Sequence, residues 1–196
     1  MTGFGGNPFE HSSYLVRRKV FTLLGAAFHV YGPEGQVILY SRQKAFKLRE
    51  DIRLYDGEDM QRELLSIHAR QIIDFSAAYD VVDSGTGAPV GALRRRGLRS
   101  LMRDEWIILD PLDHQIGTIR EDSVGLALLR RFLTNLVPQR YTVEVGGRAV
   151  AELRQRFNPF ILKLELDFSG DPGGQLDRRL GIAAGILLCA IEGRQG

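Results

Sequence analysis

The hydrophobic positions of this chain fall into short runs, continuous or alternating with polar residues, from Tyr14 onward. Clusters of glycine, proline, aspartate and serine separate these runs roughly every 8–12 residues, a rhythm typical of an antiparallel β meander. The turn clusters occupy residues 32–35, 56–59, 83–87, 110–113, 146–147 and 171–174. The pattern therefore predicts a chain made mainly of short strands, about twelve in all.

The last apolar run breaks this rhythm. Residues 180–191 contain no charged or polar side chain, counting Cys189 as apolar. A helix that is apolar on all sides has to be buried in protein or in lipid. At about 1.5 Å per residue the run spans roughly 18 Å, which is less than the ~30 Å hydrocarbon core of a bilayer. We therefore expect a helix near 177–192, capped by Asp177 and buried in a protein core.

The same helix carries a small-residue pattern, Gly181-x-x-x-Gly185. In a membrane this pattern lets two helices approach closely. Because the run is too short to span a bilayer, we favour the other interpretation, that the small residues let the helix fit a tight barrel.

About twelve strands in one domain leave unpaired edges unless the sheet closes. A closed barrel of that size is too wide for its own side chains to fill, and an apolar helix can fill it. The predicted fold is therefore mainly β, a closed antiparallel barrel of about twelve strands wrapped around the C-terminal helix. We expect a flexible lead-in over 1–13 and a single barrel domain over 14–194, with a further helix near 123–137 that ends before Pro138.

A similar pattern of strands and turns occurs three times, over residues 28–56, 79–110 and 141–167. Each copy reads as a strand, a glycine turn, a strand ending in basic residues, and then further strands. The spacing drifts between copies, so the pattern indicates a loose repeat and not a solenoid.

The composition of the chain argues against several classes of function. The chain has 196 residues and a net charge of +2, too small to favour nucleic acid as the main partner. Its single cysteine, Cys189, excludes an internal disulfide and a thiolate metal cluster. The four histidines are scattered without metal-ligand spacing, and no cofactor is expected. Because residues 1–13 have no basic head followed by an apolar run, we expect a cytoplasmic protein, peripheral at a membrane if it binds lipid.

Clustered arginines are the best functional lead. The guanidinium group is planar and can bond two phosphate oxygens at once, so such a cluster can hold lipid head groups. The candidate residues are Arg42, Lys44, Arg94, Arg95, Arg96, Arg99 and Arg103. The alternative is a solvated strand face, since 22 of the 26 basic residues are arginine. Both interpretations stay open at this point.

A family resemblance rests on the order of several phrases: residues 79–87, 90–93 with the following arginines, 106–110 and 116–119, and then the apolar run 180–191. In this order they resemble the tubby C-terminal-like superfamily, in its LURP-one-related and phospholipid scramblase branch. The resemblance implies a barrel threaded by its C-terminal helix, and functions that include phosphoinositide-dependent membrane tethering and calcium-dependent lipid scrambling.

The chain departs from the scramblases in lacking their proline-rich tail and cysteine cluster. The segment comparable to their proposed calcium site holds three carboxylates, Asp167, Asp171 and Asp177, without the spacing of an EF-hand. Calcium-driven scrambling is therefore not the favoured expectation.

Three functions remain. The first is a non-enzymatic module that binds a lipid or phosphoinositide head group, or an anionic membrane surface. The second is a soluble structural or protein-interaction scaffold, and the third is a phospholipid scramblase. Catalysis is not expected, because no nucleophile, base and metal stand in a plausible arrangement.

Overall fold

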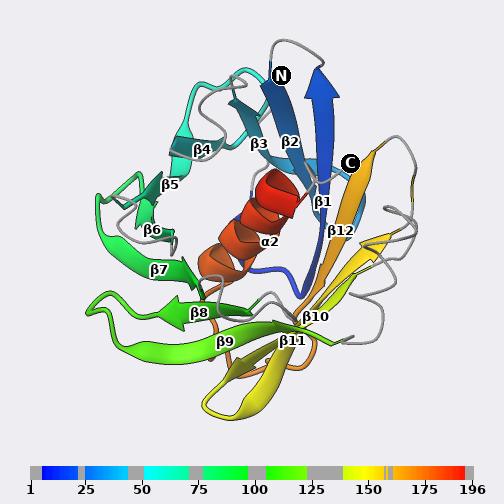
Figure 1. The fold of residues 1–196 in the computed structure, drawn as a ribbon. Coiled ribbons are helices and arrows are strands. Elements are labelled where there is room, and N and C mark those ends of the chain that lie inside the picture. Colours follow the sequence, from blue (N-terminus) through cyan, green and yellow to red (C-terminus); the bar gives the residue numbers. More distant parts are fainter. Residues whose placement is uncertain are drawn as a thin grey trace.

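The computed structural model describes residues 6–21, 25–43, 51–70, 77–96, 105–122, 139–156, 158 and 161–192. Within these residues a ring of antiparallel strands surrounds one helix, α2 (Arg178–Glu192) (Figure 1). The strands are β1 (Ser13–Phe21), β2 (Gly25–Tyr31), β3 (Val37–Gln43), β4 (Asp51–Tyr55), β5 (Glu63–Ala69), β6 (Ala78–Asp83), β7 (Pro89–Arg95), β8 (Glu105–Leu109), β9 (Gln115–Glu121), β10 (Arg140–Val145), β11 (Arg148–Arg156) and β12 (Leu162–Asp167).

The sheet is a closed barrel of twelve strands. Each strand pairs with its neighbours in the chain, and β1 pairs with β12 to complete the ring. Among the described residues every strand has a neighbour on both sides, although β3 and β4 are paired only through Tyr40 and Tyr55. The predicted fold class and the central helix are confirmed. The predicted helix near 123–137 lies outside the described residues, and the domain limits stay a prediction.

The repeat has a structural counterpart. Its first two copies begin the runs β2–β5 and β6–β9, while the third covers β10–β12. The N-terminal strand β1 takes the remaining place, between β12 and β2.

The two ends of the barrel differ. At the turn end, five short connections lie at residues 32–36, 56–62, 84–88, 110–114 and 146–147, and α2 begins there. The tightest of them is the two-residue turn of Gly146 and Gly147, with φ of 57° and 78°. Positive φ at both positions suits the right-handed twist of a hairpin, and only glycine adopts it without steric cost. The opposite end, where β1 and α2 finish, is called the helix-exit end below.

The core is formed where inward side chains of the strands meet all sides of α2. Ile182, Ala183, Ile186 and Leu187 have no exposed surface. A Cβ at Gly181 would lie 2.5 Å from the ring of Phe168. A Cβ at Gly185 would lie 2.8 Å from Leu166. The small residues therefore let the barrel wall approach the helix, which confirms the packing interpretation of the glycine pattern.

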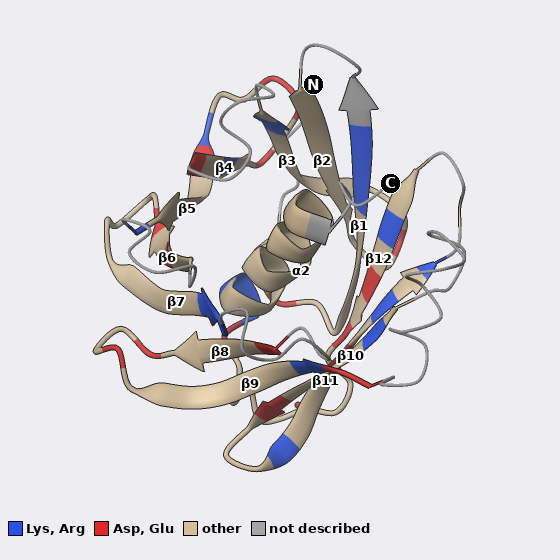
Figure 2. Ribbon diagram, in the orientation of Figure 1, with Lys and Arg blue, Asp and Glu red and all other residues tan. Residues whose placement is uncertain are grey.

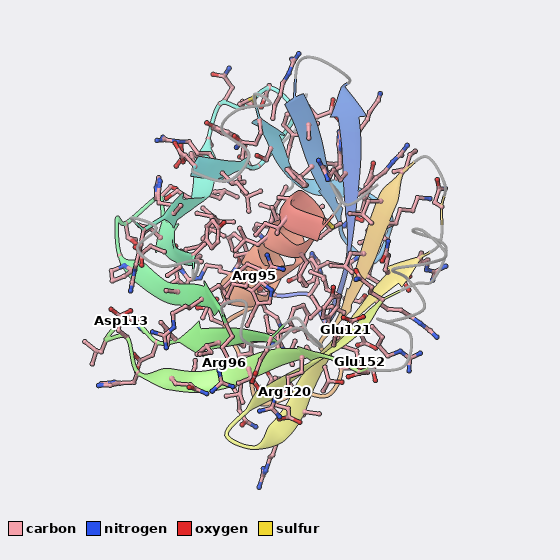
Figure 3. The ribbon with its side chains drawn as sticks, viewed as in Figure 1. Arg95, Arg96, Asp113, Arg120, Glu121 and Glu152 are labelled. Atoms are coloured by element: carbon pink, nitrogen blue, oxygen red, sulfur yellow. The ribbon has the colours of Figure 1, made fainter. Side chains whose placement is uncertain are left out.

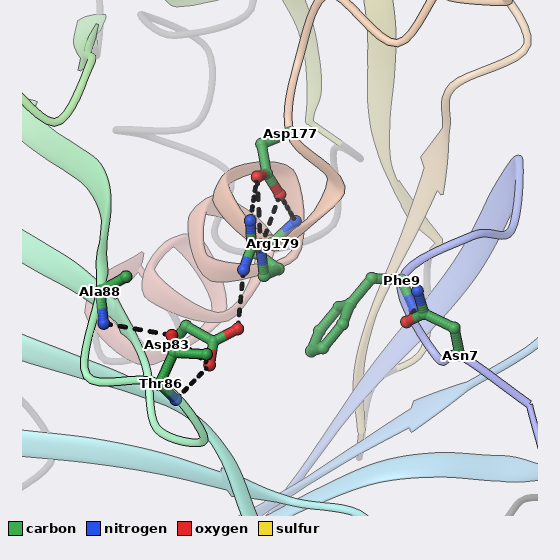
Figure 4. A network of polar contacts seen from close by, with 7 residues as sticks. All are labelled: Asn7, Phe9, Asp83, Thr86, Ala88, Asp177 and Arg179. Atoms are coloured by element: carbon green, nitrogen blue, oxygen red, sulfur yellow. Dashed lines mark hydrogen bonds and ion pairs between the residues drawn. The ribbon is translucent and has the colours of Figure 1, made fainter.

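Polar contacts hold α2 at its start. Asp177 is the N-cap, accepting the backbone N–H of Arg179 at 2.9 Å. The Arg179 guanidinium then reaches across to Asp83 at the end of β6, 2.7 Å away (Figure 4). The backbone N–H of Thr86 and this arginine both lower the pKa of the Asp83 carboxyl.

A different residue holds the other end of the helix. Arg18 on β1 points into the barrel, is 4% exposed, and donates from Nη1 to the carbonyl of Cys189 at 2.9 Å. A cation at a helix C-terminus is favoured by the helix dipole and supplies a donor to a last-turn carbonyl.

Candidate anion-binding surface

The three consecutive arginines of the predicted cluster do not share one face. Arg94 is exposed on the outer face of β7. Arg95 pairs in register with the core residue Trp106, so it lies on the inner face. Figure 3 shows Arg95 projecting to the inside of the ring of strands, with Arg96 and Arg120 near one another at its outside. The alternation of a strand separates neighbours in the sequence.

Arg96 takes part in an ion-pair network. Its Nη1 lies 2.7 Å from Oε2 of Glu105, whose Oε1 is 3.2 Å from Nε of Arg120. Burial by itself raises the pKa of the Glu105 carboxyl, but the hydrogen bonds from the two arginines outweigh it and hold that pKa below its ordinary value. Arg96 is thus already occupied by a carboxylate.

Of the other predicted residues, Arg42 is exposed on the outer face of β3. Lys44, Arg99 and Arg103 lie outside the described residues. Head-group binding by the predicted set stays a prediction.

The structure gathers a different set of cations on another side of the barrel. Strands β1, β12, β11 and β10 lie side by side, and Figure 2 shows blue bands on all four. Together with β3 they carry outward cations that have no ion pair with any residue the structure describes. We call this set the basic face: Arg17, Arg42, Arg140, Arg154 and Lys163.

Strand register explains the gathering. Arg17 on β1 lies directly opposite Lys163 on β12, and Lys163 lies opposite Arg156 on β11. Arg154 on β11 lies opposite Arg140 on β10. The Arg156 guanidinium is bound to Glu165, so it is the neutralised member of the row.

A groove of about 770 Å³ runs along the outside of β1, between β12 and the turn that follows β2. Arg17 and Lys163 line one part of it, Leu15, Tyr31 and Glu165 its middle, and Asp167 lies further along β12. Successive outward residues of a strand are about 6.7 Å apart, so the cations and Asp167 lie at opposite ends of the groove.

The three carboxylates considered for calcium are each engaged by donors. Asp171 accepts from the backbone N–H groups of Gln175 and Leu176 and from Arg178. Asp177 binds Arg179, and Asp167 accepts the backbone N–H of Ser169. Among the described residues no group of three histidine, cysteine, aspartate or glutamate side chains is placed to hold a metal ion.

Apart from Arg42, the members of the basic face were missed at the sequence level, because they are scattered from residue 17 to residue 163. A local signal exists only for Lys163, which lies between Leu162 and Leu164 in the alternating strand β12. Arg17 is followed by Arg18 and Lys19, so the sequence of β1 does not mark which of the three points outward. Neither strand's sequence reveals that the two strands are neighbours.

The described residues contain no helix with the length and hydropathy of a membrane-spanning segment. No curated protein and no solved structure matches the chain. The model of the LURP-one-related family matches residues 37–187, from β3 into α2. That range contains Lys163 but not Arg17 or Tyr31. Because the match covers more than half of the 196 residues, the chain belongs to the LURP-one-related family.

Proposed function

We propose that this protein is a non-enzymatic binding module, which attaches to anionic membrane surfaces in the cytoplasm through its basic face. The observation that carries the proposal is the side-by-side arrangement of cations on β1, β12, β11 and β10 without carboxylate partners among the described residues.

The physical basis is electrostatic. Cations near an anionic leaflet gain about 1 kcal/mol each, and salt weakens the gain. Arginines elsewhere on the barrel, such as Arg96 and Arg120, already bind carboxylates and would have to give up those partners. Arg17, Arg154 and Lys163 form no ion pair in the described part of the chain, and Glu165, which lies opposite Arg154, is bound to Arg156.

The contacts of α2 favour a surface module over a scramblase. Leaving the barrel would break the contacts of Arg18 with Cys189, of Arg179 with Asp83 and of Arg178 with Asp171. It would also expose a helix that is buried on every side. A fixed barrel that binds with its outer face needs none of these changes.

Vesicle flotation tests the proposal. We expect the protein to float with phosphatidylserine or phosphoinositide vesicles at low salt, to float less at high salt, and not to float with neutral vesicles. The triple variant Arg17→Ala, Arg154→Ala, Lys163→Ala should bind about 100-fold more weakly, since three charges of about 1 kcal/mol each are removed.

Arg148→Ala is the matched control. Arg148 is an exposed arginine at the turn end of β11, with no ion pair to a described residue. Its removal should leave flotation nearly unchanged. Failure of the wild-type protein to float under any condition would contradict the proposal and favour the scaffold, for which a stable protein partner would then be sought.

A further inference from the structure

Within the basic face, Arg17 and Lys163 form a pair that stands out. They are direct cross-strand partners and both are half-buried on the wall of the β1 groove. Like charges placed directly opposite destabilise a sheet. The Nε atom of Arg17 is in addition buried and has no hydrogen-bond acceptor among the residues that the structure describes. An unsatisfied buried donor is costly, so the pair is poised to gain from a bound anion.

The nearby acidic side chains that the structure describes do not pair with Arg17 or Lys163. Glu165, one outward position from Lys163, is bound to Arg156. Glu58 lies 3.0 Å from Nε2 of His29, the β2 neighbour of Arg17. Asp167 lies two outward positions from Lys163, opposite Ser13. Within the described part of the chain, the carboxylates therefore leave Arg17 and Lys163 unpaired and repel an anion from the rest of the groove.

We infer that this part of the β1 groove is a binding site for a terminal phosphate monoester. A monoester carries close to two negative charges at neutral pH, which matches two adjacent cations better than the single charge of a phosphodiester. The Arg17 guanidinium can donate to two oxygens while Lys163 supplies a compact charge. Leu15 and Tyr31 provide an apolar wall for the group that bears the phosphate.

The size of the groove agrees with this assignment. Its volume of about 770 Å³ lies within the range of about 300–1,000 Å³ that small-ligand pockets occupy. Where the monoester is the head group of a membrane lipid, the assignment rests on the proposed function. The same chemistry applies to a soluble monoester.

The lipid experiment compares vesicles of equal surface charge that contain phosphatidic acid, a monoester, or phosphatidylserine, a diester. The wild-type protein should prefer phosphatidic acid about fivefold, the effect of one additional charge near the site. The double variant Arg17→Gln, Lys163→Gln should lose the preference while keeping some salt-sensitive binding. Arg154→Gln, outside the groove, is the matched control and should keep the preference.

The soluble experiment measures thermal unfolding with glycerol 3-phosphate and with dimethyl phosphate at the same ionic strength. Glycerol 3-phosphate alone should raise the Tm of the wild-type protein and of Arg154→Gln, and not that of the double variant. This measurement also shows that the double variant folds.

The two experiments separate the two proposals. Binding to all anionic vesicles without a monoester preference overturns the groove site and leaves the surface module standing. Failure to float, together with stabilisation by glycerol 3-phosphate that the double variant loses, overturns the membrane proposal and supports the groove as a site for a soluble monoester. A preference that survives in the double variant overturns the groove assignment.

Discussion

Asp171 shows how a single buried acid can organise the entry to a helix. Its side chain has no exposed surface and accepts hydrogen bonds from two backbone N–H groups and from Arg178 at 2.7 Å. Burial raises the pKa of the Asp171 carboxyl, but the Arg178 and backbone hydrogen bonds outweigh it and bring the pKa below its ordinary value. The carboxylate is therefore a structural element of the turn between β12 and α2.

We expect Asp171→Asn to lower the free energy of unfolding by about 3 kcal/mol at pH 7, because it leaves a half-buried arginine without its partner. Since the folded-state pKa is depressed, the stabilisation is fully present above the unfolded-state value of 3.8 and is lost as the pH falls through the folded-state pKa. Urea unfolding from pH 7 to pH 3 should show the two proteins converging at the acid end.

Asp167→Asn provides the comparison, because Asp167 is exposed. Asp167→Asn should lower the free energy of unfolding by well under 1 kcal/mol at pH 7. A constant difference between wild type and Asp171→Asn across the whole pH range would argue against the role given to this carboxylate.

Gly181 is the second residue whose identity the packing dictates. We expect Gly181→Ala to destabilise the protein by about 1–2 kcal/mol, although alanine is the better helix former, because the new methyl group meets the buried Phe168 ring. Thermal unfolding measures this directly. Gly173→Ala, where a Cβ meets nothing within 4 Å, should be close to neutral. Equal effects at the two sites would disprove the packing argument.

Among the elements, α2 fills the interior of the barrel and is bound at each end to a different strand. Arg179 joins its first turn to β6, and Arg18 joins its last turn to β1. These contacts fix where the helix lies along the barrel axis, which apolar packing alone does not specify, because hydrophobic burial is non-directional.

Arg18→Ala should therefore lower the free energy of unfolding by about 2 kcal/mol, from the lost hydrogen bond and the cavity left behind. Amide hydrogen exchange should become faster in the last turn of α2 first. Lys19→Ala is the paired control, because Lys19 is the next residue of β1 and is exposed. Unchanged exchange at the helix C-terminus in Arg18→Ala would mean that packing alone holds that end.

The pairing of β1 with β12 places two cations, Arg17 and Lys163, directly opposite each other, which lowers the stability of the sheet. Removing one of two directly opposed cations should relieve repulsion, so Lys163→Gln is expected to raise the free energy of unfolding by about 0.5 kcal/mol at low salt. The gain should shrink as salt screens the charges. Chemical denaturation at low and high salt checks this. A lower free energy of unfolding for Lys163→Gln at low salt would show that Lys163 stabilises the fold and does not destabilise it.

At the scale of the whole molecule, ring closure makes the N-terminal strands essential. The family match starts at Val37, but β1 and β2 precede it and complete the barrel. Without them β3 and β12 would each present a row of unpaired backbone groups.

A fragment beginning at Val37 should consequently aggregate or fail to show a cooperative unfolding transition, whereas a chain beginning at Asn7 should unfold like the full protein. Size-exclusion chromatography and circular dichroism distinguish the two results. A monomeric, cooperatively folded fragment from Val37 would show that β1 and β2 are dispensable for closure.

Much of the architecture was predictable from local patterns. The turn clusters coincide with connections between elements, except that Asp83 is the last residue of β6, and the run 180–191 lies within α2. Asp177 is the predicted cap. These features depend on residues within a few positions of one another, where turn chemistry, side-chain period and capping act.

The candidate site was much less predictable. Arg94, Arg95 and Arg96 looked like one cluster, but strand alternation places Arg95 on the inner face, and Arg96 binds Glu105. Whether a neighbouring arginine is available depends on which carboxylate the adjacent strands bring to it, and that information is not local.

Short-range periodicity and the need to bury an all-apolar helix were enough to predict the strand rhythm, the turns, the buried helix and hence a closed barrel. The position of Arg17 opposite Lys163 in a groove depends on how the strands are arranged in the folded barrel. The reason is that β1 and β12 are at opposite ends of the strand order in the chain and become neighbours only when the ring closes.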